Sequence, residues 1–189
     1  VRGSQGARAL NRALLDALAR ALRGALPPWP EGATLYWSTG PAHHAAVRAR
    51  LAELGDPGWV RAVPYIDPME TAWAAADLAI SRAGAMAVAE MCAWGVPMLL
   101  VPFPAAAGDH QRRNAEALAA AGAARWWPEE WIAREPDLLW RAAAELLADP
   151  DARAAMARAA RARGRPDAAR RIAGDVLALA RASREEADP

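Results

Sequence analysis

Residues 80–114 read ISRAGAMAVAEMCAWGVPMLLVPFPAAAGDHQRRN, and this stretch decides the fold. Two short apolar runs each lead through small residues into a helical pattern, the first at Ala83-Gly84-Ala85 and the second before Asp109-His110-Gln111. In an open parallel sheet, ligands bind at the carboxyl ends of the strands. A helix that begins after glycine and alanine can offer free backbone N–H groups and its positive dipole end to a phosphate. The stretch therefore predicts a nucleotide site.

Strand and helix patterns alternate on both sides of this stretch. We expect strands at 33–37, 60–63, 77–81, 98–101 and 123–127, and helices at 9–26, 41–54, 70–75, 85–94 and 111–121. After Pro128 only helices are expected, at 129–134, 136–148, 150–163 and 166–182. This alternation predicts an α/β protein with a doubly wound, Rossmann-like parallel sheet, followed by C-terminal helices.

The first residues have the pattern of a loop rather than of a domain start. Residues 1–7, VRGSQGA, read as the end of a strand and a phosphate-type loop. We therefore expect the first strand of the sheet to be truncated and the chain to be a fragment.

Composition narrows the class of protein. The formal net charge of +1 gives no electrostatic reason for binding nucleic acid. The single cysteine, Cys92, excludes an intramolecular disulfide and fits a reducing, cytoplasmic setting. No apolar run approaches the ~20 residues that a membrane-spanning helix needs. Near the end, a stripe of apolar residues at helical spacing needs a partner: Ile172, Val176, Leu177 and Leu179.

Four motifs occur in order along the chain: GSQGARALN at 3–11, YIDPM at 65–69, SRAGAMAVAE at 81–90 and DHQRRNA at 109–115. Together they resemble the C-terminal, donor-binding half of the MurG family of bacterial peptidoglycan glycosyltransferases, which belong to glycosyltransferase family 28. The resemblance covers nearly the whole chain, to about residue 182. Two positions depart from the family pattern, since Arg2 stands where a glycine is usual and Ala87 where threonine is frequent.

The resemblance implies the C-terminal half of a GT-B fold, with residues 1–182 forming a UDP-sugar donor-binding domain and 183–189 a frayed tail. It implies inverting transfer of N-acetylglucosamine from UDP-GlcNAc to undecaprenyl-pyrophosphoryl-MurNAc-pentapeptide (lipid I). The resemblance implies that the reaction needs no cofactor and no metal ion at the donor site. An N-terminal acceptor domain, which this chain lacks, would bind lipid I and contact the cytoplasmic face of the membrane. The catalytic residue is not assigned, because it would belong to that domain.

The resemblance also implies a role for individual residues. Ser4 and Gln5 would approach the diphosphate and sugar, Ile66 would hold uracil, and Glu90 would bind the ribose hydroxyls. The remaining donor contacts would come from the start of one helix, at Gly84, Ala85 and Met86, and from the start of the next, at His110, Gln111 and Asn114. The last of these would mainly support the loop.

Each residue also has an ordinary structural interpretation. Ser4 could cap a helix, Ile66 could be core, and His110 could be an exposed residue at a helix start. Glu90 lies among apolar neighbours, so a ligand would satisfy a carboxylate that is costly to bury, but it could also be exposed or paired with arginine. Arg82 could bind the diphosphate or a carboxylate. The Asp149-Pro150-Asp151 string is interpreted as a helix cap and not as a metal motif.

Other functions are compatible with these motifs. The chain could be a non-catalytic UDP-sugar-binding subunit of a split glycosyltransferase, or part of a related glycolipid glycosyltransferase with another acceptor. In every case we expect the isolated chain to bind UDP-sugar weakly and to have no transferase activity.

Overall fold

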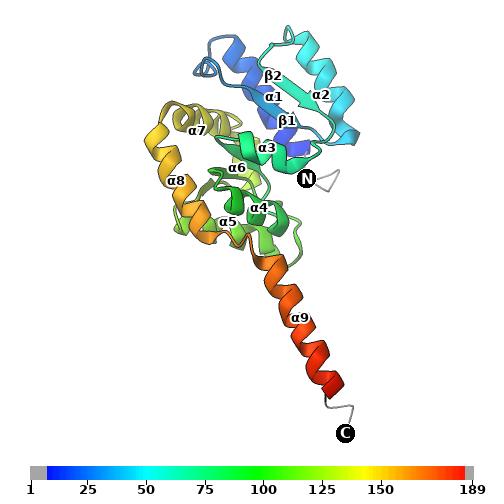
Figure 1. Cartoon of the computed structure of the whole chain (residues 1–189). Helices are drawn as coiled ribbons and strands as arrows, with labels where there is room; N and C mark the ends of the chain where they lie inside the picture. Colours follow the sequence, from blue (N-terminus) through cyan, green and yellow to red (C-terminus); the bar gives the residue numbers. More distant parts are fainter. Residues whose placement is uncertain (1–7, 186–189) are drawn as a thin grey trace.

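The computed structural model describes residues 8–185, in which short strands alternate with helices (Figure 1). The elements in chain order are α1 Arg8–Leu22, β1 Leu35–Ser38, α2 Pro41–Glu53, β2 Val60–Val63, α3 Met69–Ala75, β3 Ala79–Ser81, α4 Ala85–Trp94, β4 Met98–Leu100, the 3₁₀ turn η1 Ala107–Asp109, α5 His110–Ala120, β5 Ala124–Trp126, α6 Glu129–Arg134, α7 Asp137–Ala148, α8 Pro150–Arg163 and α9 Ala168–Glu185.

All strand pairs of the described part are parallel, but they form two sheets where one was predicted. β1 pairs with β2, and β3-β4-β5 form a separate three-stranded sheet. The spatial order agrees with the doubly wound order 3-2-1-4-5-6, in which the first strand of the fold lies between the second and the fourth. Among residues 8–185 no strand occupies that central position, so β1 and β3 have no ladder between them. The doubly wound fold class is confirmed, and the predicted truncated first strand lies outside the described residues.

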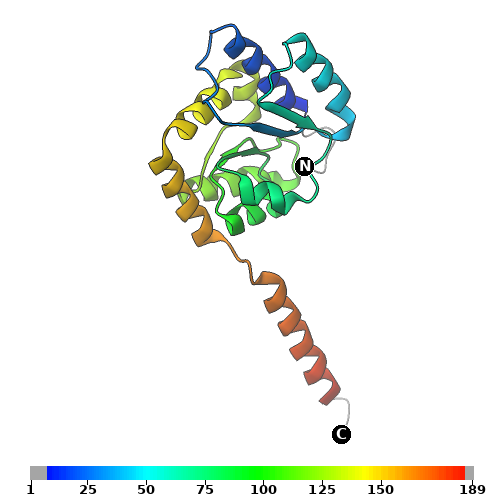
Figure 2. The ribbon, with the colours of Figure 1, turned by 45° about the horizontal axis from the view of Figure 1, so that its top comes forward.

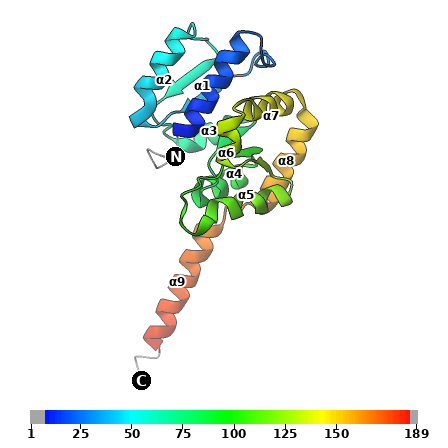
Figure 3. The ribbon, with the colours of Figure 1, turned by 180° about the vertical axis from the view of Figure 1, so that it is seen from behind.

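Alternating side chains of β4 divide the core into two layers. Met98 and Leu100 pack in one cluster with α4, α5 and α8, whereas Leu99 and Val101 pack in another with α1, α6 and α7. Because successive side chains of a strand point to opposite faces, this central strand is buried on both sides. Figures 2 and 3 show the two helical layers from different directions.

A third cluster covers one face of the β1-β2 sheet, where α1 and α2 pack on Trp37 and Val60. Three tryptophan rings border this cluster: Trp29 stacks on Trp59 with the ring centroids 5.4 Å apart, and Trp140 lies 4.9 Å from Trp29. Trp140 is fully buried and its indole N–H donates to the carbonyl of Pro27 at 2.8 Å. The aromatic cluster thus joins α7 to the β1-β2 half of the molecule.

One predicted helix end is wrong for a local reason. The sequence places the end of the first helix before Pro27, but α1 ends at Leu22. Gly24 has φ +76°, and the N–H of Ala25 donates to the carbonyl of Arg20 at 3.0 Å. This is the glycine-dependent helix end of the Schellman type, which stops the helix before the prolines can.

The last helix, α9, extends away from the body of the molecule (Figure 1). Its apolar stripe is solvent-exposed: Ile172 is 63% exposed and Val176 59%. The stripe that the sequence predicts to need a partner is therefore exposed in the structure. No helix of the described part is long and apolar enough to cross a membrane.

Candidate functional site

The predicted donor residues that the structure describes lie on loops and helix starts at the carboxyl ends of the strands. Two of these loops, β3–α4 and β4–α5, are tied together by side chains. Asn114 Nδ2 of α5 donates to the carbonyl of Ala83 at 3.0 Å, and Ala83 is fully buried. Asn114 therefore links α5 to the loop that leads into α4.

The start of α4 is open for a ligand. Gly84 has extended backbone angles at the N-cap position, and no side chain caps the helix. A Cβ on Gly84 would meet no heavy atom within 4 Å, and Met86 is 76% exposed. The first N–H groups of a helix have no intrahelical acceptor. The helix start can therefore bind an anion through its backbone and dipole.

Glu90 differs from the expectation that it is buried, because its side chain is exposed. α4 buries Val88, Met91 and Cys92, and Glu90 falls on the opposite side of the helix. Its carboxylate accepts a hydrogen bond from the indole N–H of Trp73 in α3 at 3.0 Å. This bond engages one carboxylate oxygen, Oε2, of a side chain that is exposed as a whole.

Ile66 is buried on the loop between β2 and α3, while the preceding Tyr65 is 51% exposed. The burial agrees with core packing of the Ile66 side chain. Any contact with a ligand would therefore come from its main chain, and that contact stays a prediction.

The loop between β4 and α5 presents His110 and Gln111. His110 is exposed, and its Nδ1 lies 2.8 Å from the carbonyl of Ala107. Gln111 Oε1 accepts the N–H of Phe103 at 3.0 Å. Asp109 has the N-cap position of α5, but its side chain does not cap the helix: its φ is +56°, and its carboxylate pairs with Arg112.

Arg82 is paired with protein groups. Its side chain is only 4% exposed and forms an ion pair with Glu129 at the start of α6. Its Nη1 also donates to the carbonyls of Val101 and Pro102, at 3.0 and 3.1 Å. Of the two interpretations that the sequence left open, the structure thus has the carboxylate partner.

Ser4 and Gln5 lie outside the described residues, but the helix that follows them is firmly anchored. Asn11 of α1 is buried, donates to the carbonyl of Thr39 at 2.8 Å and accepts the indole N–H of Trp37 at 3.0 Å. These bonds connect the first turns of α1 to the carboxyl end of β1.

Sequence reasoning missed Trp73 and Phe103, which hold Glu90 and Gln111. Trp73 is 17 residues from Glu90, and neither aromatic residue belongs to a local pattern that marks a site. The juxtaposition of α3 with α4 brings Trp73 to Glu90, and only the tertiary structure shows it.

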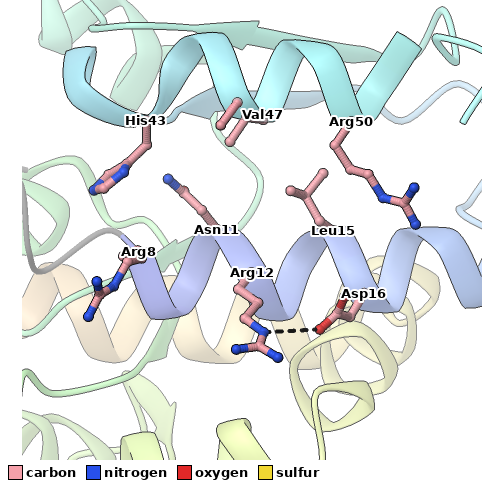
Figure 4. A pocket seen from close by; sticks show the side chains of 9 residues that line it. Arg8, Asn11, Arg12, Leu15, Asp16, His43, Val47 and Arg50 are labelled. Carbon is pink, nitrogen blue, oxygen red and sulfur yellow. Dashed lines mark ion pairs between the residues drawn. The ribbon is translucent and has the colours of Figure 1, made fainter. Parts of the chain in front are cut away.

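Two cavities of the described part lie elsewhere. One, of about 210 Å³, lies between α1 and α2 and is lined by Arg8, Arg12, His43 and Arg50 among others (Figure 4). The other, of about 500 Å³, lies between α1 and α6. Neither of these two cavities is lined by a predicted donor residue.

The structure also bears on metal binding. Asp149 is the N-cap of α8, and its side chain accepts the N–H of Ala152 at 2.9 Å. The cap interpretation of Asp149-Pro150-Asp151 is thus confirmed. Within residues 8–185 no group of three or more His, Cys, Asp or Glu side chains could hold a metal ion.

Comparison with known proteins gives one family. The model of the glycosyltransferase family 28 C-terminal domain matches residues 1–172. The chain is 47% identical over 189 residues to the UDP-N-acetylglucosamine--N-acetylmuramyl-(pentapeptide) pyrophosphoryl-undecaprenol N-acetylglucosamine transferase of Sorangium cellulosum, covering 98% of this chain and 44% of the relative. The enzyme of the same name from Salinibacter ruber is 42% identical, and the match covers 94% of this chain and 45% of the relative.

Among solved structures, Acinetobacter baumannii MurG is 32% identical with a TM-score of 0.73, covering 90% of this chain and 48% of that one. The calicheamicin glycosyltransferase CalG4 is 26% identical with a TM-score of 0.59, and the match covers 89% of this chain and 40% of that one. The chain spans about half the length of the curated relatives that it matches.

Proposed function

Because this chain belongs to the glycosyltransferase family 28 C-terminal domain family, we propose that it is the donor-binding part of an inverting N-acetylglucosaminyltransferase. The donor would be UDP-GlcNAc and the acceptor lipid I, in accordance with the names of its relatives from Sorangium and Salinibacter. The product would be lipid II, a precursor of peptidoglycan.

One observation carries the proposal: the start of α4 is exposed and uncapped, and Asn114 of α5 holds the loop that leads into it. The N–H groups of Gly84, Ala85 and Met86 would bind the diphosphate. As UDP leaves, negative charge grows on its phosphates, and these donors and the helix dipole would offset that charge in place of a metal ion.

The other donor groups follow from their places around α4. Glu90 would bind the ribose hydroxyls with its exposed carboxylate, which Trp73 orients through one oxygen. The main chain at Ile66 would hold uracil, while His110 and Gln111 would bind the sugar. Ser4 and Gln5 would complete the diphosphate and sugar contacts from the loop before α1.

The acceptor side of the reaction would need a second domain. That domain would bind lipid I and supply the base that activates the acceptor hydroxyl. It would also contact the cytoplasmic face of the membrane. Because the acceptor groups are proposed for that second domain, we expect this chain alone to bind UDP-GlcNAc weakly and to transfer no sugar. Turnover of lipid I by the 189-residue chain would contradict this prediction.

Substitution of Glu90 tests the donor site. We expect Glu90→Gln to weaken UDP-GlcNAc binding about tenfold and Glu90→Ala by about tenfold to a hundredfold, because a hydrogen bond to a charged group contributes about 1.5–3 kcal/mol. Isothermal titration calorimetry with UDP-GlcNAc measures the change.

Glu145→Gln is the matched control, since Glu145 is an exposed glutamate on α7 that pairs with Arg125. It should leave the affinity unchanged. Equal affinity in Glu90→Ala and the unaltered chain would remove Glu90 from the site, and the absence of any binding by the unaltered chain would contradict the donor-binding role itself.

A further inference from the structure

Arg82 is a buried cation directly before the loop that leads into α4. Its guanidinium contacts two separate parts of the chain. One is the segment 101–103, through the carbonyls of Val101 and Pro102 and the ring of Phe103, whose centroid lies 5.5 Å from Cζ; the other is the carboxylate of Glu129. A buried charge is costly unless it is paired and hydrogen-bonded, and these contacts meet that need.

The geometry requires arginine rather than any cation. One nitrogen of the guanidinium donates to two carbonyls while another faces Glu129, and the flat group lies over an aromatic ring. A lysine ammonium is compact and cannot combine a planar fork with stacking. Arg82 thereby fixes the chain at Val101 and Pro102 and the position of Phe103, where the β4–α5 loop begins.

Phe103 in turn determines how Gln111 is oriented. The N–H of Phe103 donates to Gln111 Oε1 at 3.0 Å, so the amide oxygen is engaged by the loop. A glutamine amide has one acceptor oxygen and two N–H donors. With the oxygen held, the NH₂ group is left to donate to a ligand at the start of α5.

We infer that Arg82 is a positioning residue: through Phe103 it holds Gln111 in the orientation that recognises the sugar hydroxyls of a nucleotide-sugar, without touching the ligand itself. This inference rests on the proposed donor-binding function. It assigns Arg82 to discrimination between UDP-GlcNAc and UDP, because Gln111 faces the sugar whereas the start of α4 faces the diphosphate.

The test measures the dissociation constants of UDP-GlcNAc and of UDP for the Arg82→Lys variant. We expect the dissociation constant for UDP-GlcNAc to rise about fivefold to tenfold, the loss of about one hydrogen bond, while that for UDP changes less than about twofold. Gln111→Ala should have the same effect, and the double variant should lose no more than either single one, since both changes act on one contact. Arg125→Lys, an exposed arginine paired with Glu145, is the control.

Amide hydrogen exchange at Phe103, followed by NMR without ligand, is the second readout. We expect Arg82→Lys to speed exchange of this amide about tenfold or more while the amides inside α4 and α5 are unchanged. If Arg82→Lys does not fold, Glu129→Gln, which weakens the Arg82 pair without removing the arginine, should have the same effects in smaller measure.

The outcomes separate the two proposals. An equal loss of affinity for both ligands, or unchanged affinity for both with slow exchange at Phe103, would overturn the positioning role. If the unaltered chain binds neither ligand, the donor-binding function fails, and exchange at Phe103 still decides whether Arg82 orders this loop.

Discussion

Arg82 and Glu90 have environments opposite to those that their charge and their neighbours along the chain suggest. Arg82 is buried although it is charged, because Glu129 and two carbonyls surround it. Glu90 is exposed although Val88, Met91 and Cys92 are apolar, since these three share the face of α4 that packs on the sheet. At the scale of the residue, the direction of a side chain from its helix decides its environment more than the apolar character of its neighbours does.

Cys92 allows a prediction at this scale. Burial raises the pKa of its thiol, an effect that the nearby charge of Arg163 partly opposes. Since the thiolate is the reactive form, we expect a thiol reagent such as dithiobis-nitrobenzoate to label the native chain far more slowly than the chain unfolded in guanidinium. Rapid labelling of the native chain would contradict the burial of Cys92.

The same raised pKa makes stability depend on pH. Above the ordinary thiol value of 9.0 the unfolded chain releases this proton while the folded chain retains it. The contribution of Cys92 is therefore fully present below pH 9 and is lost as pH rises towards the folded pKa. Unfolding in urea at pH 7 and pH 10 should show a larger decrease in free energy for the natural chain than for Cys92→Ala.

At the scale of the element, most bounds could be predicted because their signals are local. β2, α4, α6 and α8 have the predicted bounds, and caps at Asp149 and Gly95 mark two of their ends. α1 is shorter than predicted because Gly24 ends it. Local signals of this kind do not predict how one helix packs on another. The packing of α8 on α4 is an example that can be tested by mutation.

A glycine at the end of α8 allows this packing. A Cβ on Gly164 would lie 2.9 Å from the carbonyl oxygen of Cys92 and 3.0 Å from Cα of Ala93. We expect Gly164→Ala to lower the free energy of unfolding by about 1–3 kcal/mol, because backbone atoms of α4 would have to move. Denaturant unfolding measures the change.

Gly174 in α9 is the matched control. A Cβ there meets no heavy atom within 4 Å, and alanine favours a helix interior by up to about 1 kcal/mol. Gly174→Ala should therefore be neutral or stabilising. Similar stability of the two variants would show that α8 does not approach α4 as closely as the structure has it.

At the scale of the whole molecule, α9 is separate from the body that carries the site. Its stripe is exposed at Ile172, Val176, Leu177 and Leu179, and it follows a bend after Gly164 (Figure 1). A helix with one apolar face gains stability by packing that face. We therefore expect this exposed stripe to favour self-association of the chain.

Deletion of residues 168–189 tests this separation. We expect the melting temperature to change by less than about 2 °C, the shift that corresponds to under ~1 kcal/mol in a domain of this size. Sedimentation velocity should show less self-association than for the full chain. A large drop in melting temperature would mean that α9 supports the core.

The sequence by itself determined the α/β class, the doubly wound parallel sheet, most element bounds to within two residues and the family, because strand and helix periodicity, caps and short motifs are local properties. Only the tertiary structure decided that Trp73 holds Glu90, that Arg82 pairs with Glu129 47 residues away, and that the described strands form two sheets. These features depend on which elements come together in space. Residues 80–114 therefore mark the proposed donor site, and residues distant in the sequence determine how the side chains of that site are held.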